Sequence, residues 1–270
     1  MSHAIVETFA LFGVGIAAGT INAVVGSGTL ITFPTLLAFN YSPVLANVSN
    51  NVGLVPGVLS GVYGYRAELR GQRARLLALG TASLCGGLVG AILLLILPAD
   101  AFKAIIPVLI GIALVMVLVQ PRLARWVAAR QRAREARQAR ETGGAADGRR
   151  SADAAGGPLL WLLVFCTGIY GGYFGAAQGV LLIGLLGIAF DEKLQRLNAV
   201  KNVLAAVVNG VAAVVFIAVS HVAWEVAALI AAGSVLGGLL GARIGLRLPP
   251  WGLRLVIICV GIAALVKLLV

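Results

Sequence analysis

Charged side chains are scarce in this sequence. They make up 11% of its 270 residues, and only ten of them are acidic. Soluble domains average about 25% charged residues. The chain is instead 60% hydrophobic, with a mean hydropathy of +1.00, and long apolar runs recur along its whole length. This scarcity of charge excludes a soluble domain with a single anchor and predicts an integral membrane protein that crosses the bilayer several times.

Cysteine and histidine are equally rare. Cys85, Cys166 and Cys259 stand singly within apolar segments, without a CxxC motif, and are expected to be small buried side chains. The only histidines are His3 and His221. We therefore predict no metal site, no cofactor and, without paired buried carboxylates or a buried histidine, no enzymatic activity. The net charge of +11 does not indicate nucleic-acid binding, because the basic residues lie mainly between hydrophobic segments.

The apolar segments predict a polytopic all-α fold. Segments of about 17–25 residues can cross a bilayer, and eight are of this kind, the fifth being rather short: residues 4–25, 44–65, 76–97, 101–119, 159–174, 197–220, 224–246 and 253–270. Two more, residues 29–39 and 180–190, have 11 residues each. At about 1.5 Å per residue these two cannot cross a core about 30 Å thick. We predict that they are half-helices or re-entrant segments.

The chain contains an internal repeat. When it is shifted by 151 residues, "SLCGGLVGA" at 83–91 falls on "SVLGGLLGA" at 234–242, with six of nine positions identical. The same shift, without a gap, aligns Gly28 with Gly179, Asn47 with Asn198, Asn51 with Asn202 and Pro98 with Pro249. A constant offset over this length indicates a duplication. We expect one transmembrane repeat over residues 1–119 and a second over 159–270.

Between the repeats, residues 120–158 hold nine Arg against four acids. This composition predicts a cytoplasmic linker held near anionic lipid, in part a surface helix and in part flexible; specific docking of a protein is the alternative. In the first repeat, the loop at 66–75 is also basic. In the second repeat, the equivalent loop around His221 has no Lys or Arg, and the basic residues lie instead in the loops before and after it. By the positive-inside rule, the two repeats have inverted topologies.

Each repeat carries glycines at the start of its short apolar segment. In "TINAVVGSGTLITFPTLL" these are Gly26 and Gly28, and in "GGYFGAAQGVLL" they are Gly175 and Gly179. A dinucleotide-binding fingerprint is excluded, because Ile31 stands where a third glycine belongs and no strand precedes it. Two helix breaks in inverted repeats predict a site near the membrane midplane, where helix N-termini favour an anion. Close helix packing is the alternative reason for the glycines.

Polar residues in and near these breaks are the candidate ligands. The breaks contribute Asn22, Ser27, Gly28, Thr29, Gln178 and Gly179. The following segments add two sets spaced i, i+3, i+4, which share one helix face: Asn47, Asn50 and Asn51, and Asn198, Lys201 and Asn202. Asn209 continues the second face. Such residues normally face the bundle interior, although hydrogen bonds between helices would also account for the asparagines.

Lys201 is the most informative of these residues. Flanked by asparagines, it would supply a fixed positive charge for an anionic substrate. It lies only about one turn inside its helix, so a side chain that snorkels to the interface is the alternative. Glu7, Asp100, Asp191 and Glu225 are the acids outside the basic loops and the linker, and they lie at segment ends. No carboxylate is therefore predicted to carry a coupling proton.

Several motifs together resemble one transporter family. "AAGTINAVVGSGTLITFPTLLAF", "NNVGLVPG" with "YGYRAEL", "GIYGGYFGAAQGVLL", "NAVKNVLAAVVN" and "GSVLGGLLGARIGLRLP" are similar to the TauE/SafE sulfite exporters, also called TSUP permeases. The resemblance covers both repeats and leaves out only the Arg-rich linker. It implies a multi-pass plasma-membrane transporter of sulfite, organosulfonates or small organic acids.

The expected function is therefore secondary transport of a small anion by alternating access. The expected partners are that anion and the lipid bilayer; a coupling proton or sodium ion, and assembly as a homodimer, are compatible with this function. A passive anion channel is an alternative that only flux measurements would separate. A membrane-embedded enzyme or assembly factor is a further alternative, for which the sequence offers no catalytic pair or metal cluster.

Overall fold

The computed structural model describes residues 2–141, 157–244 and 250–269, and these residues form helices joined by short loops. The elements are α1 (Ser2–Val24), α2 (Thr29–Ala38), α3 (Pro43–Gly64), the short 3-10 helix η1 (Arg66–Leu69), α4 (Arg73–Ile96), α5 (Ala99–Glu141), α6 (Pro158–Tyr173), α7 (Gln178–Ala189), α8 (Leu194–Val219), α9 (Trp224–Ile244) and α10 (Pro250–Leu269). Five described helices, α1, α4, α5, α8 and α9, are long and apolar enough to cross a membrane. The prediction of a polytopic all-α membrane protein is confirmed.

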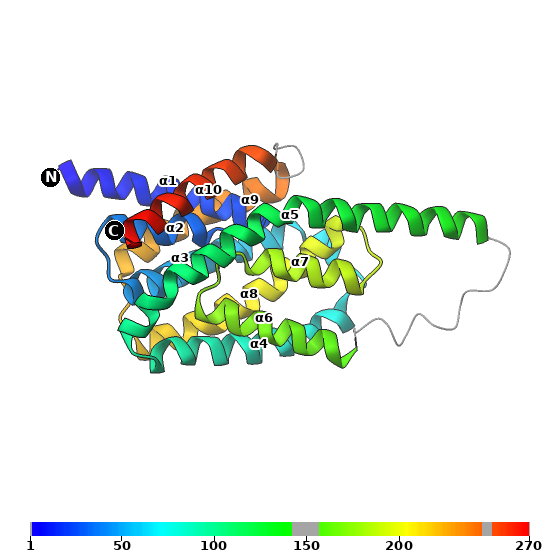
Figure 1. Cartoon of the computed structure of the whole chain (residues 1–270), viewed down its shortest axis with the longest axis horizontal. Coiled ribbons are helices and arrows are strands. Elements are labelled where there is room, and N and C mark those ends of the chain that lie inside the picture. The colour runs from blue at the N-terminus through cyan, green and yellow to red at the C-terminus, as the bar shows by residue number, and fades with distance from the viewer. Residues whose placement is uncertain (1, 142–156, 245–249, 270) are drawn as a thin grey trace.

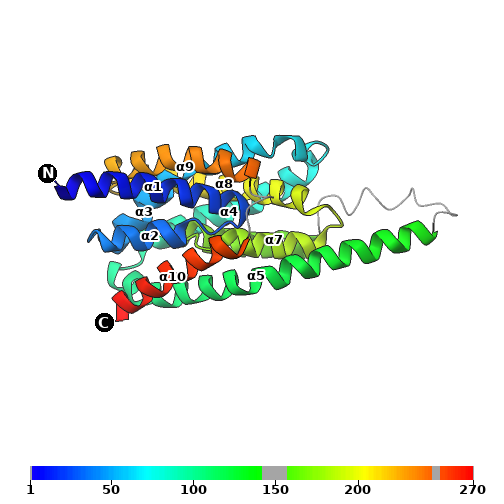
Figure 2. The ribbon, with the colours of Figure 1, turned by 90° about the horizontal axis from the view of Figure 1, so that it is seen from above.

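The short helices α2 and α7 each return to the end of the molecule from which the preceding helix came. At one end, the Tyr41 hydroxyl after α2 donates a hydrogen bond of 2.8 Å to the carboxylate of Glu7 near the start of α1. At the other end, Phe190 after α7 shares a hydrophobic cluster with Leu160 near the start of α6. The pairs α1–α2 and α6–α7 are therefore re-entrant hairpins that enter the bundle from opposite ends (Figures 1 and 2).

The two repeats run in opposite directions, as the sequence predicts. In Figure 1, α1 and α6 point in opposite directions along the long axis, and so do α5 and α10. The repeats also exchange helices, since α9 of the second packs along α1 and α3 of the first, while α4 of the first packs along α6 and α8 of the second. This reciprocal packing gives the bundle an approximate two-fold symmetry.

Glycines of the repeated motif hold this exchange together. A Cβ atom on Gly86 would lie 2.2 Å from the carbonyl oxygen of Phe165, and one on Gly237 would lie 2.1 Å from that of Ile16. Neither distance leaves room for a side chain, so these helices approach through their backbones. The motif at 83–91 and 234–242 is therefore a packing device in both repeats.

The Arg-rich stretch continues α5 to Glu141 and does not begin a separate helix. A helix of 43 residues is about 65 Å long at 1.5 Å per residue, roughly twice the thickness of a bilayer core. Its C-terminal part projects beyond the bundle in both views (Figures 1 and 2). The glycine-rich remainder of the predicted linker, at 142–156, lies outside the described residues.

One expectation about the cysteines is wrong. Cys85, Cys166 and Cys259 are exposed on the outside of the bundle, where we expected buried side chains. The physical reason is that lipid is as apolar as a helix interior, so an apolar neighbourhood in the sequence does not imply an inward-facing position.

Candidate functional site

The two helix breaks cross each other inside the bundle. The N–H of Gly179 donates a hydrogen bond of 3.2 Å to the carbonyl oxygen of Gly26. A Cβ on Gly26 would lie 2.4 Å from the Cα of Gly179. Gly26 has φ +83° and Ala177, its equivalent under the shift of 151, has φ +61°. Both breaks thus contain a left-handed residue at the same position of the repeat, and the second break has a further one at Gly175, with φ +78°.

Asparagines of each repeat bind the broken helix of the other. The amide nitrogen of Asn47 on α3 donates to the carbonyl oxygen of Tyr173, the last residue of α6, at 2.9 Å. The equivalent Asn198 on α8 donates to the carbonyl oxygen of Ala23 in α1 at 3.1 Å. The last carbonyls of a helix have no partner within it. These two side chains therefore cap α6 and α1 across the repeat boundary.

Lys201 is fully buried, with 0% of its surface exposed, and binds the same end of α1. Its Nζ donates to the carbonyl oxygens of Asn22 and Ala23, each at 3.2 Å. The amide of Asn202 also donates to the oxygen of Ala23, at 3.4 Å. The side chain points inward and does not snorkel. Its amine lies at the negative end of the α1 dipole, where a cation is favoured.

The equivalent position in the first repeat is Asn50, whose bonds are different. Its amide nitrogen donates to the Thr29 hydroxyl at 3.3 Å, and its oxygen accepts a short hydrogen bond from Thr32. Under the shift of 151, the two threonines correspond to Val180 and Ile183. α7 therefore offers no hydroxyl at the positions where α2 holds Asn50.

A small polar cavity lies where these elements meet. Its volume is about 10 Å³, enough for about one water molecule. Six predicted ligands line it: Asn22, Thr29, Gln178, Gly179, Lys201 and Asn202. Asn209, on the continuation of the same α8 face, lines it too, together with Gly26, Val58, Gly175 and Ala205. Val58 and Ala205 are ordinary small apolar helix residues, and nothing in the sequence marks them.

The remaining predicted residues stand around the cavity without lining it. Asn47, Asn50 and Asn198 make the bonds described above. The N–H of Gly28 donates to the side-chain oxygen of Asn22 at 3.4 Å. Asn51 lies on α3 beside Asn50, and its buried side-chain oxygen has no partner among the described residues.

Two buried polar atoms at equivalent positions also lack partners among the described residues. They are the Ser27 hydroxyl oxygen and the Gln178 side-chain nitrogen, in residues that are 0% and 3% exposed. Ser27 and Gln178 are related by the shift of 151 and stand at the starts of α2 and α7. Buried polar atoms normally have partners, so this pair indicates room for a further hydrogen-bonding group. By contrast, the N–H groups of Gly28 and Gly179 already have acceptors.

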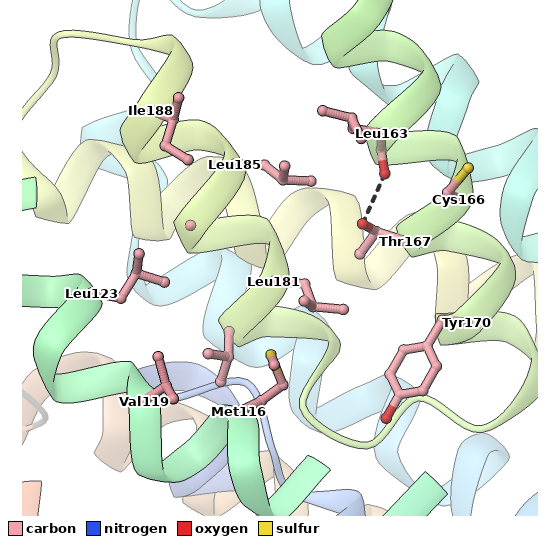
Figure 3. Close-up of a pocket in the computed structure, with 12 residues that line it drawn as sticks. Met116, Val119, Leu123, Leu163, Cys166, Thr167, Tyr170, Leu181, Leu185 and Ile188 are labelled. Carbon is pink, nitrogen blue, oxygen red and sulfur yellow. Dashed lines mark hydrogen bonds between the residues drawn. The ribbon is translucent and has the colours of Figure 1, made fainter. Parts of the chain in front are cut away.

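A larger groove lies outside this site, between α5, α6 and α7 (Figure 3). Its volume is about 410 Å³ and its walls are mostly apolar, with Met116 and Leu181 among them. The Thr167 hydroxyl in its wall donates to the carbonyl of Leu163, and the Tyr170 hydroxyl donates to the carbonyl of Ala176. The two hydroxyls of its wall are therefore already bonded, unlike the polar atoms of Ser27 and Gln178 in the central site.

Inverted repeats with discontinuous helices that meet around a buried polar site are the architecture of many secondary transporters. The comparisons with known proteins agree with this class. The family model "Sulfite exporter TauE/SafE" matches residues 11–268, and the chain belongs to this family. The protein is a multi-pass membrane transporter.

Two relatives with assigned names are similar to this chain. The "Probable membrane transporter protein YfcA" of Escherichia coli K12 is 28% identical over 260 residues, which covers 96% of this chain and 88% of YfcA. The "Probable membrane transporter protein ORF9" of a Sinorhizobium species is 32% identical over 105 residues, 38% of this chain and 40% of that protein. No solved structure matches.

Proposed function

We propose that the protein is a secondary transporter that moves a small anion across the plasma membrane by alternating access. Sulfite is the first candidate, and organosulfonates and small organic acids follow. The observation that carries the proposal is the fully buried amine of Lys201 at the crossing of the two helix breaks. Ionisable residues inside a membrane normally mark a substrate or ion pathway.

The chemistry of the site favours an anion. Hydrogen-bond donors converge on the cavity from Lys201 and Asn202, and the unpartnered nitrogen of Gln178 is a further donor. The described lining contains no carboxylate. An oxyanion such as sulfite accepts hydrogen bonds at every oxygen, so these donors suit it. The family description, which names a sulfite exporter, supports the same substrate class.

The size of the cavity supports alternating access more than a passive channel. Room for about one water is too small for an anion with three oxygens. The site must therefore widen before it binds substrate. Because Gly26 and Gly179 are in direct backbone contact, a movement of one hairpin relative to the other would open it.

Charge supports an orientation. The basic loop at 66–75 meets the first turn of α8, where Arg196 donates to the carbonyl of Arg70. The Arg-rich part of α5 projects from the bundle (Figure 1). We propose that this end, with the linker at 120–158, faces the cytoplasm. The division into repeats at 1–119 and 159–270 and the formation of a homodimer remain predictions from the sequence.

Counterflow in proteoliposomes tests the proposal. Vesicles that contain the purified full chain and are loaded with unlabelled sulfite should take up radiolabelled sulfite faster than empty vesicles, with saturation. Uptake that rises linearly with concentration and does not respond to internal sulfite would indicate a channel. The absence of any flux above protein-free vesicles, for sulfite and for methanesulfonate alike, would contradict anion transport.

A further inference from the structure

The end of α1 is a cation site that the protein fills with its own lysine. Two backbone carbonyl oxygens, of Asn22 and Ala23, point at one Nζ from 3.2 Å. They lie at the negative end of a helix that stops inside the bundle, and broken transporter helices often coordinate a coupling sodium ion with such carbonyls. Here Nζ stands where that ion would be. A sodium ion bound to the same two oxygens would lie beside an ammonium group and be repelled by it.

The broken helix of the second repeat, α6, has no such cation bonded to its end among the described residues. The end of α6 is held by the neutral amide of Asn47, and the equivalent of Lys201 is Asn50, which bonds to hydroxyls of α2. The symmetric architecture therefore carries one amine on one side only. This amine lines the cavity at the crossing of the breaks.

No acidic side chain of the described residues is bonded to this amine. The elements packed against α8 are α3, α4, α6, α7 and η1, and α1 contacts Lys201 itself. The titratable or charged side chains described on α8 and these elements, apart from Lys201, and at the junction of α3 and η1 are Glu7, Tyr63, Tyr65, Arg66, Glu68, Arg73, Arg75, Cys85, Cys166, Tyr170, Tyr173 and Arg196. None of the hydrogen bonds or ion pairs found in the described structure joins one of them to Lys201. α7 carries no such residue.

An ammonium ion buried without a counter-ion is costly, because its desolvation is not offset. A bound anion would supply the counter-charge, since an ammonium group has three N–H donors and only two are used here. When the anion leaves, the cost is avoided if a proton leaves as well and the neutral amine remains. Gain and loss of the proton are thus tied to gain and loss of the anion.

We propose that Lys201 carries the coupling proton and that the transporter is a sodium-independent proton–anion symporter. One proton joins the amine as one monoanion binds beside it, and both are released on the other side. The transport of a monoanion is then electroneutral. This inference rests on the proposed anion transport and adds the coupling ion to it.

The test uses the full wild-type chain in proteoliposomes. Methanesulfonate is the preferred probe, because it is a permanent monoanion that carries no proton of its own. If only sulfite exchanges in counterflow, sulfite is used at an alkaline pH where it is deprotonated.

A pH gradient, acidic outside, should drive accumulation of the anion and acidify the lumen, as reported by a trapped pH indicator. For methanesulfonate the accumulation limit is about tenfold per pH unit, because the anion ratio balances the proton ratio. A sodium gradient at constant pH should drive none, and a potassium–valinomycin potential should leave methanesulfonate uptake unchanged.

The outcomes separate the two proposals. If the protein is active in counterflow but a pH gradient drives neither anion accumulation nor lumenal acidification, or if a sodium gradient drives accumulation, proton coupling is overturned and anion transport remains. No counterflow with either probe would overturn the proposed function and this inference with it.

A matched pair of variants locates the proton. Lys201→Gln should lose accumulation driven by the pH gradient, whereas Lys193→Gln, at an exposed lysine just before α8, should keep it. Proton-driven accumulation in Lys201→Gln at the wild-type level would contradict the role of Lys201. If this variant does not fold, Lys201→Arg replaces it: its guanidinium keeps the positive charge but does not release a proton, so counterflow should persist while pH-driven accumulation is lost, and wild-type accumulation would contradict the role of Lys201.

Discussion

The two halves of the central site share their backbone plan and differ in their charge. In both halves the chain turns through a left-handed residue, a short helix returns, and an asparagine caps the other repeat's broken helix. One half then places Asn50 against two hydroxyls of α2, whereas the other places Lys201 against two carbonyls of α1. The one position where Asn50 in the first repeat corresponds to Lys201 in the second thus places a single amine in an otherwise symmetric site.

The neighbours of Asn50 and Lys201 differ in the same way as these two residues do. Thr29 and Thr32, which hold Asn50, are valine and isoleucine at the equivalent positions of α7. A lysine there has no hydroxyl to bind on α7, and its longer side chain reaches the end of α1. The two halves therefore share their backbone architecture, whereas only one of them carries a charged side chain at this position.

The largest effect should come from Lys201→Asn, which makes the second half match the first. Asparagine cannot reach both carbonyls and supplies no charge to an anion. Removing one partner of a buried charge pair costs about 3–5 kcal/mol, so sulfite counterflow should fall at least about 100-fold. Asn50→Gln, which lengthens the equivalent side chain without a charge, is the control and should keep more activity. Wild-type flux in a folded Lys201→Asn protein would remove Lys201 from the site.

The crossing of the breaks should tolerate no side chain. Gly26→Ala forces a residue with φ +83° to carry a Cβ 2.4 Å from Gly179. We expect about 1–2 kcal/mol for the left-handed backbone and about 1–3 kcal/mol more for overpacking. Gly71→Ala is the matched control, since Gly71 has φ +77° but a Cβ on it would have no neighbouring atom within 4 Å. Equal losses of thermal stability in detergent for both variants would show that the crossing is not tightly packed.

The two capping asparagines should differ in strength. Asn47→Ala leaves the carbonyl of Tyr173 without a side-chain donor among the described residues, whereas Asn198→Ala leaves that of Ala23 with Lys201 and Asn202. We expect a destabilisation of about 1–2 kcal/mol for Asn47→Ala and less for Asn198→Ala. Thermal unfolding of the two purified variants measures this. The reverse order would mean that the extra donors at Ala23 do not compensate.

The smallest effect should come from Thr32→Val, which removes the hydroxyl that bonds to Asn50 and makes α2 resemble α7. The shape is nearly conserved. The buried oxygen of Asn50 loses its donor, but hydrogen bonds between membrane helices average about 0.6 kcal/mol, so the cost should be about 1 kcal/mol. Sulfite affinity, measured as the half-saturation of counterflow, should stay close to that of the wild type. A large loss of affinity would place Thr32 in the substrate site, which its position outside the cavity lining does not suggest.

Local and repeated patterns explain which features the sequence predicted. Segment length and hydropathy predict the helices, because the bilayer forces backbone groups to bond within each helix. A constant offset of 151 predicts the duplication, and the glycines predict both breaks. The wrong expectation that the cysteines are buried came from the same logic, since composition does not say which face of an apolar helix meets lipid.

The partners of Lys201 show the limit of that reasoning. Its spacing from Asn198 and Asn202 predicts a shared helix face, and the structure has all three bind the end of α1. Those carbonyls lie nearly 180 residues earlier in the chain and belong to the backbone, so no side-chain pattern announces them. For the same reason, the sequence could not decide whether Lys201 points inward or snorkels to the interface.

By itself, the sequence determined a helical membrane protein made of two inverted repeats, with a break in each and a polar face after each break. Only the tertiary structure decided that the breaks touch at Gly26 and Gly179, that each repeat caps the helix of the other, and that one lysine occupies a helix end. The reason is that helix formation depends on neighbours in the chain and on the bilayer, whereas a site at a symmetry axis is made by groups that only the folded arrangement brings together.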